Sequence, residues 1–261
     1  MYNNVYVLDD KLEIVGKLEA IAPDERIYST RFIGDRLYLV TFKRVDPLFV
    51  IDLSNPENPE ILGELKIPGF SDYLHPYDEN HIIGVGKETE GNEWGGVSVK
   101  GVKLALFDVS DVKNPRQIDA YEIGEAGTDS EALRDHKAFL FDKKKNILVI
   151  PVTEVKSKPY YDPRLGYYRQ SYWQGVYVFS ITPEEGFEVK GKITHNEGEE
   201  ERDYYYYGSP NAVRRALYMD DVLYTVSAIK IKANDIDDID NELKEIKLPF
   251  EKVKYYEYPW Y

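Results

Sequence analysis

Cysteine is absent from this chain of 261 residues. Its absence excludes disulfide bonds, thiolate nucleophiles and cysteine-ligated metal sites. Long hydrophobic runs are missing as well, because no stretch approaches the roughly 18 apolar residues of a membrane-spanning helix. The N-terminal sequence MYNNVYVLDD lacks the basic and apolar regions of a signal peptide. We therefore expect no membrane span, and any export signal would have to lie upstream of this sequence.

Positive charge is in short supply. Lys and Arg number 33 against 47 Asp and Glu, which leaves an acidic chain with a net charge of −14. Because phosphate binding needs a basic face, this balance argues against nucleic acid as a partner. It also disfavours anionic membrane surfaces. Methionine is rare, with two residues, and 31% of residues are charged, a composition that fits a thermophile.

Recognisable catalytic and metal-binding motifs are missing too. There is no Gly-x-Ser-x-Gly elbow and no His-Glu-x-x-His pair. The loop ETEGNEWGGVSVKG (88–101) lacks the Gly-Lys-Ser/Thr ending of a phosphate loop. The aspartates of NDIDDIDNE (234–242) alternate with isoleucines and lack the glycine of a calcium loop, so we interpret them as structural. We predict no catalytic residue, no metal and no cofactor. The histidines show no ligand spacing: His75, His81, His136 and His195.

One phrase occurs twice in what the sequence does contain. LFVIDLSNPENPEILGELKIPG covers 48–69, and LALFDVSDVKNPRQIDAYEIGE covers 104–125, so that Asp52 aligns with Asp108. Each phrase predicts an apolar strand, a polar turn and a second, alternating strand. Because the aspartate recurs at the start of the turn, we interpret it as a turn-forming residue and not as a catalytic acid.

Two more strand-like runs precede each phrase, so the unit has four short strands. A third unit has HKAFLFD (136–142) as its first strand and Ser180 in place of the aspartate. A fourth uses NDIDDID (234–240) as its third strand, with Asp240 at the aspartate position. Such repeats without helical stretches predict an all-β fold, a β-propeller of four-stranded antiparallel blades, about four and a half of them in this chain. A β-sandwich is the alternative.

The repeats divide the chain as a single propeller domain over 1–261. We expect a half blade with only the last two strands at 1–24, blades at 25–69, 70–125, 135–196 and 211–250, and an aromatic tail at 251–261.

The long stretch 25–88, together with 102–115, 135–152 and 214–227, resembles a prokaryotic family. These are secreted proteins containing a C-terminal β-propeller domain distantly related to WD-40 repeats. The resemblance implies an extracellular or cell-surface location. The family has no assigned activity, so the resemblance implies no catalytic residues.

Full members of that family carry more sequence before the point that matches the start of this chain. A ring of four and a half blades would expose a sheet edge and an apolar face. We therefore expect a homo-oligomer or a missing N-terminal propeller segment to complete the structure.

Aromatic residues concentrate in stretches that do not repeat. Loops longer than about 12–15 residues are uncommon unless they are functional or disordered. The insertion 156–174 and the segment 197–210 therefore hold candidate binding residues, with packing onto the propeller as the alternative for both. The candidates are Trp94 in the loop 88–101 and, in the two aromatic segments, Tyr160, Tyr161, Arg164, Tyr167, Tyr168, Arg169, Tyr172, Trp173, Tyr204, Tyr205, Tyr206 and Tyr207.

Three functions fit this sequence. The first is a non-enzymatic extracellular or cell-surface binding or interaction module that presents aromatic-rich blade loops to a protein or glycan partner. The second is a secreted hydrolase or lyase with carboxylates or tyrosines at the channel mouth, since composition does not exclude a carboxylate pair. The third is a structural segment completed by assembly.

Overall fold

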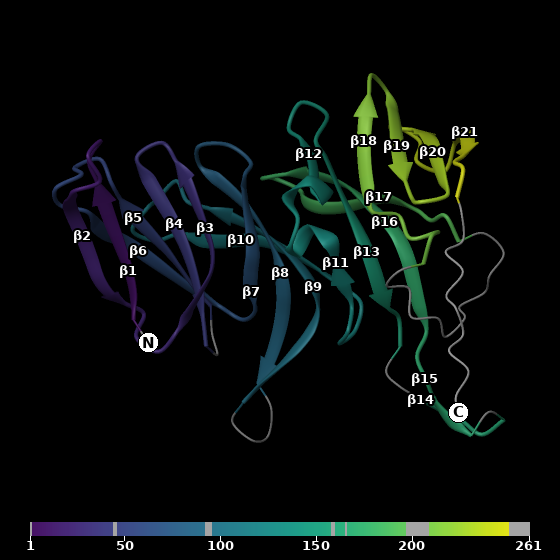
Figure 1. The fold of residues 1–261 in the computed structure, drawn as a ribbon, viewed down its shortest axis with the longest axis horizontal. Coiled ribbons are helices and arrows are strands. Elements are labelled where there is room, and N and C mark those ends of the chain that lie inside the picture. Colours follow the sequence, from purple (N-terminus) through teal and green to yellow (C-terminus); the bar gives the residue numbers. More distant parts are fainter. Residues whose placement is uncertain are drawn as a thin grey trace, which may run out of the picture.

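The computed structural model describes residues 2–43, 46–91, 96–157, 160–164, 166–196 and 209–250, with the backbone alone for 46 and 167–169. Within these ranges the chain is built from antiparallel strands and contains no α-helix. Five sheets follow one another in chain order along the molecule (Figure 1). The first and the last sheet lie at opposite ends, so the sheets form an open row and not a closed ring (Figure 1).

In each of sheets 2, 3 and 5 the four strands pair in sequential order. Sheet 1 has two strands, and sheet 4 has a divided first strand. Sheet 1 comprises β1 (Asn3–Leu8) and β2 (Ile14–Ile21). Sheet 2 comprises β3 (Arg26–Ile33), β4 (Arg36–Phe42), β5 (Asp46–Asp52) and β6 (Glu60–Ile67). Sheet 3 comprises β7 (Phe70–Pro76), β8 (His81–Gly91), β9 (Val97–Asp108) and β10 (Arg116–Ile123).

The C-terminal half contains the longer connections. Two short 3-10 helices, η1 (Glu131–Leu133) and η2 (His136–Ala138), separate the two parts of the first strand of sheet 4. Sheet 4 comprises β11 (Asp129–Ser130), β12 (Leu140–Asp142), β13 (Ile147–Val155), β16 (Tyr172–Thr182) and β17 (Gly186–Ile193). Sheet 5 comprises β18 (Arg215–Met219), β19 (Val222–Val226), β20 (Lys230–Asp235) and β21 (Glu242–Lys247). A separate hairpin is formed by β14 (Tyr160–Asp162) and β15 (Tyr167–Arg169).

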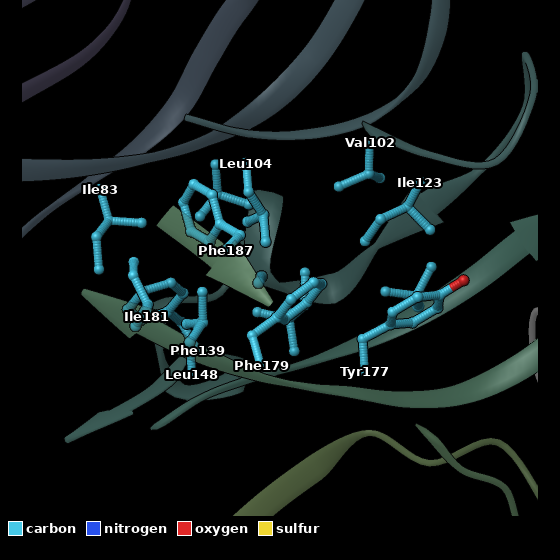
Figure 2. Packing of buried hydrophobic residues seen from close by; sticks show 14 of the residues in the cluster. Ile83, Val102, Leu104, Ile123, Phe139, Leu148, Tyr177, Phe179, Ile181 and Phe187 are labelled. Atoms are coloured by element: carbon cyan, nitrogen blue, oxygen red, sulfur yellow. The ribbon is translucent and has the colours of Figure 1, made fainter. Parts of the chain in front are cut away.

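Apolar side chains fill the space between neighbouring sheets. The middle of β4 packs on both faces: Leu39 packs toward sheet 1, while Tyr38 and Val40 pack toward sheet 3. Successive residues of a strand point to opposite faces, so a strand covered on both sides needs apolar residues at every position. The same arrangement produces the cluster between sheets 3 and 4, where Leu104 and Phe179 face each other (Figure 2).

The repeated aspartate occupies the last position of the third strand. Asp52 pairs with the first residue of β4, and Asp108 with the first residue of β8. Each carboxylate accepts a hydrogen bond from the amide two residues later, at 2.9 Å. The interpretation as a turn-forming residue is confirmed.

In sheet 5 the prediction that NDIDDID (234–240) forms the third strand was wrong. β20 is Lys230–Asp235, and Asp235, not Asp240, takes the position of the repeated aspartate. Its carboxylate accepts the amide of Asp237 at 2.9 Å. VLYTVSAIKIK (222–232), whose sequence predicts one long second strand, instead turns at 227–229, so the third strand begins earlier than the alternation of Asp and Ile suggested.

The first strand of sheet 4 also departs from the prediction. HKAFLFD was expected to be one strand, yet only Leu140–Asp142 forms a strand, and His136–Ala138 forms η2. The cause lies in the next strand, where Pro151 has no N–H to donate to the sheet. The first strand therefore pairs with β13 on either side of this position, and the Ser130 hydroxyl donates to the Pro151 carbonyl at 2.6 Å.

Candidate functional site

The first strand of sheet 4 is interrupted opposite Pro151. There, residues 129–135 project charged side chains toward the two neighbouring sheets. We call residues 129–135 the inner bulge. Arg134 donates two hydrogen bonds to Asp129, at 3.0 and 2.7 Å. From sheet 3, Lys87 donates to the Thr128 carbonyl and lies 3.5 Å from Asp129 Oδ1. The bulge is therefore fixed to sheet 3 through charged groups.

Sheet 5 holds the other side of the inner bulge. Arg215, the first residue of β18, lies 3.0 Å from Glu131 and also donates to Asp135. Asp135 in turn caps η2 by accepting the amide of Lys137 at 3.0 Å. Three successive sheets therefore meet through one charged cluster.

Asp72 on β7 interacts electrostatically with Lys87, Asp129 and Arg134 of this cluster. Burial raises its pKa to about 6, an effect that the Lys87 ammonium opposes and the Asp129 carboxylate reinforces. Burial also lowers the pKa of Lys87, while Asp129 raises it. A carboxyl that titrates near neutral pH can exchange a proton with a ligand under mild conditions.

A pocket of about 240 Å³ lies between the inner bulge and the segment that leads into β18. Its walls come from β11, η1, β13, β16 and residues 212–214. Gln174 fixes one wall, because its amide side chain both donates to the Val213 carbonyl and accepts the Val213 amide, each at 2.9 Å. This pairing makes the wall a built part of the structure.

The insertion 156–174 divides into two environments. At its start the β14–β15 hairpin extends away from the stacked sheets (Figure 1), and Tyr160 and Tyr161 leave 49% and 54% of their surface exposed. Arg164 in the turn is exposed too, and its amide donates to Asp162 at 2.9 Å. Three of the predicted binding residues are therefore exposed to solvent.

The end of the same insertion packs inward. Trp173 contacts the cluster between sheets 3 and 4, and Lys192 lies 5.3 Å above its ring. The neighbouring Tyr177 donates to Glu154 at 2.7 Å, and burial together with this bond raises the pKa of Tyr177. Tyr172 is half-buried and donates to Gln170 at 2.9 Å.

The structure does not describe the side chains of the remaining candidates. Tyr167, Tyr168 and Arg169 contribute the backbone of β15. Trp94, Tyr204, Tyr205, Tyr206 and Tyr207 lie outside the described residues, as does the tail 251–261.

Among the described residues, no group of three or more His, Asp and Glu side chains is arranged to hold a metal ion. The described residues also include no helix long and apolar enough to cross a membrane.

Stacked four-stranded antiparallel sheets, each covered by the next, are the architecture of a β-propeller. A family model described as a β-propeller domain matches residues 1–239. The chain therefore belongs to the β-propeller domain family, and the predicted fold class is confirmed.

Similar proteins come from archaea. An uncharacterised protein of Archaeoglobus fulgidus is 42% identical over 89% of this chain and 30% of its own length. An uncharacterised protein of Methanocaldococcus jannaschii is 48% identical over 58% of this chain and 22% of its own length. The chain thus spans less than a third of the length of either relative.

Among solved structures, a mutant of the Synechocystis apocarotenoid oxygenase matches 87% of this chain and 49% of its own. The identity is 14% and the TM-score 0.35. This likeness is too low to support a conclusion about function.

Sequence reasoning missed the inner bulge and its pocket. Asp129, Glu131 and Arg134 belong to no motif, and their partners Lys87 and Arg215 are far away in the chain. One signal was present: a proline in the middle of the apolar run ILVIPVTEV marks a break in the adjacent strand.

Proposed function

We propose that this protein is a non-enzymatic binding module that presents the β14–β15 hairpin to a protein or a glycan. The observation that carries the proposal is the exposure of Tyr160 and Tyr161 on a hairpin that projects from the sheets. Tyr and Arg side chains are enriched among residues that dominate binding energy, because they combine contact area with hydrogen-bonding groups. Arg164 in the hairpin turn supplies such a group.

The proposed location of this module is the cell surface or the exterior of the cell. The support is the resemblance of the sequence to exported prokaryotic proteins with a WD-40-like propeller. A surface location would give an exposed aromatic hairpin access to glycans and to the domains of other proteins.

Binding can be tested with a glycan array and with affinity capture from cell-surface fractions. The test variant is Tyr160→Ala combined with Tyr161→Ala. Tyr6→Ala is a matched control, because Tyr6 is exposed to 46% on the distant β1. We expect the double variant to lose at least about 10-fold in affinity, the typical effect of removing a central aromatic contact, and the control to bind normally.

Two results would count against this proposal. Unchanged binding by the hairpin variant would show that the partner uses another surface. Absence of any specific partner in both assays would contradict a binding function altogether.

A structural role is a second candidate, favoured by sheet 1. In the described residues β1 pairs only with β2, whereas every later sheet of the row has at least four strands. Apolar side chains beside this sheet are exposed, Leu12 to 78% and Phe32 to 63%. Strands from a second copy, or from a segment such as those of the longer relatives, would complete the blade. A solution mass equal to the 30.3 kDa monomer would exclude a stable homo-oligomer.

A hydrolase or lyase is favoured by Asp72 and Asp129. A raised-pKa carboxyl beside an ionised one is a common basis for acid–base catalysis. Asp72→Asn would abolish such an activity, and an activity that survives this substitution would exclude the role.

A further inference from the structure

The pocket beside the inner bulge differs from the proposed hairpin surface in shape and chemistry. It is concave, holds about 240 Å³, and is smaller than the roughly 300–1,000 Å³ typical of sites for drug-sized ligands. Pro151, Val152, Ala212 and Val213 contribute apolar surface to its lining. A small ligand with a short aliphatic part would fit this space.

The charged residues of the lining balance one another. Asp129 and Glu131 carry negative charge, and Arg134 and Arg214 carry positive charge. A site of this composition has no net preference for a simple anion or a simple cation. A ligand that carries one charge of each sign would match it.

Hydrogen bonds within the protein already occupy some of these groups. Arg134 uses both outer nitrogens on Asp129. Glu131 engages Arg215 through Oε1, at 3.0 Å. Gln174 is committed to the backbone of Val213.

Three polar groups of the lining keep binding capacity. Among the described residues, no carboxylate lies within ion-pair distance of Arg214, whose side chain is exposed. Glu131 Oε2 and the Thr153 hydroxyl likewise have no hydrogen-bond partner in the part of the chain that the structure describes. One cation, one carboxylate oxygen and one hydroxyl are thus left to a ligand.

We propose that this pocket binds a small zwitterion of the amino-acid type. Arg214 pairs with the ligand carboxylate, since a guanidinium presents a planar pair of donors to it. Glu131 accepts from the ligand ammonium, and Thr153 supplies a further hydrogen bond. A short side chain rests on the apolar part of the lining.

Calorimetric titration with three related compounds tests this proposal. L-Alanine carries both charges, L-alanine amide only the ammonium, and propionate only the carboxylate. We expect saturable binding of L-alanine, with an affinity at least about 10-fold higher than that of either singly charged analogue, since a charge-assisted hydrogen bond contributes on this scale.

Two variants assign the roles, and one serves as control. Arg214→Gln and Glu131→Gln should each weaken L-alanine binding by at least about 10-fold. Arg26→Gln, an exposed arginine at the start of β3, should leave it unchanged. Unfolding temperatures of all variants establish that the fold is kept.

Three outcomes would overturn the proposal. The first is no saturable heat with L-alanine at about 10 mM, where even a millimolar site would be filled. The second is equal binding of L-alanine and one singly charged analogue. The third is normal L-alanine binding by both folded variants. The hairpin substitutions are not involved, so this result is independent of the proposed function.

Discussion

Replacing Asp72 by asparagine should stabilise the protein at alkaline pH and leave its stability nearly unchanged in acid. Asp72 is half-buried, and its carboxyl forms no hydrogen bond with any of the described groups that would compensate for burial. Ionising this carboxyl therefore costs free energy in the folded state. Asparagine has nearly the same shape and carries no charge, so the substitution removes this cost.

The magnitude follows from the pKa. A change from 3.8 in the unfolded chain to about 6 in the folded protein corresponds to about 3 kcal/mol. Since Asp72 keeps contact with solvent, we expect about 2 kcal/mol. Between these two pKa values the folded state binds the proton more tightly, so the stability due to protonation is complete below pH 3.8 and is lost as the pH rises through about 6.

Urea unfolding of the wild type and of Asp72→Asn between about pH 4 and pH 8 measures the effect. The variant should be more stable by about 2 kcal/mol at pH 8, with the difference shrinking toward zero at pH 4. Asp35→Asn, at an exposed turn, is the matched control. An equal difference at both ends of the pH range would refute the argument, because burial of a charge acts only when the group is ionised.

Three further predictions concern the scaffold. Gly86→Ala should destabilise the protein by more than about 3 kcal/mol, because the added Cβ would lie 1.6 Å from the Phe70 carbonyl oxygen. Gly91→Ala is the control, since there is open space around Gly91. Similar unfolding midpoints for the two variants would contradict this reasoning. Phe179→Ala should lower the free energy of unfolding by about 3–5 kcal/mol, since the ring is fully buried between sheets 3 and 4 (Figure 2). A decrease below about 1 kcal/mol would mean that neighbouring side chains fill the cavity left by the ring. Asp108→Ala should lower the free energy of unfolding at pH 7 by about 1–2 kcal/mol through loss of its turn and arginine hydrogen bonds, and an unchanged value would show that the turn forms without them.

The candidate site was only partly accessible to prediction from the sequence. The insertion 156–174 was recognisable as a departure from the repeat, yet the sequence could not show that Tyr160 faces outward and Trp173 inward. Both residues lie in strands that begin with similar aromatic sequences. Their exposure differs because the β14–β15 hairpin leaves the stacked sheets, whereas Trp173 lies in β16 and packs against the cluster between sheets 3 and 4.

The amino-acid sequence by itself determined the class of fold. Strands covered on both faces require continuous apolar runs, and turns require short polar residues, so a repeated blade leaves a repeated phrase that includes Asp52 and Asp108. Tertiary structure decided where the repeat fails. The charged cluster joins Lys87, Asp129 and Arg215 from three sheets, and contacts of this kind depend on how sheets stack and not on spacing along the chain.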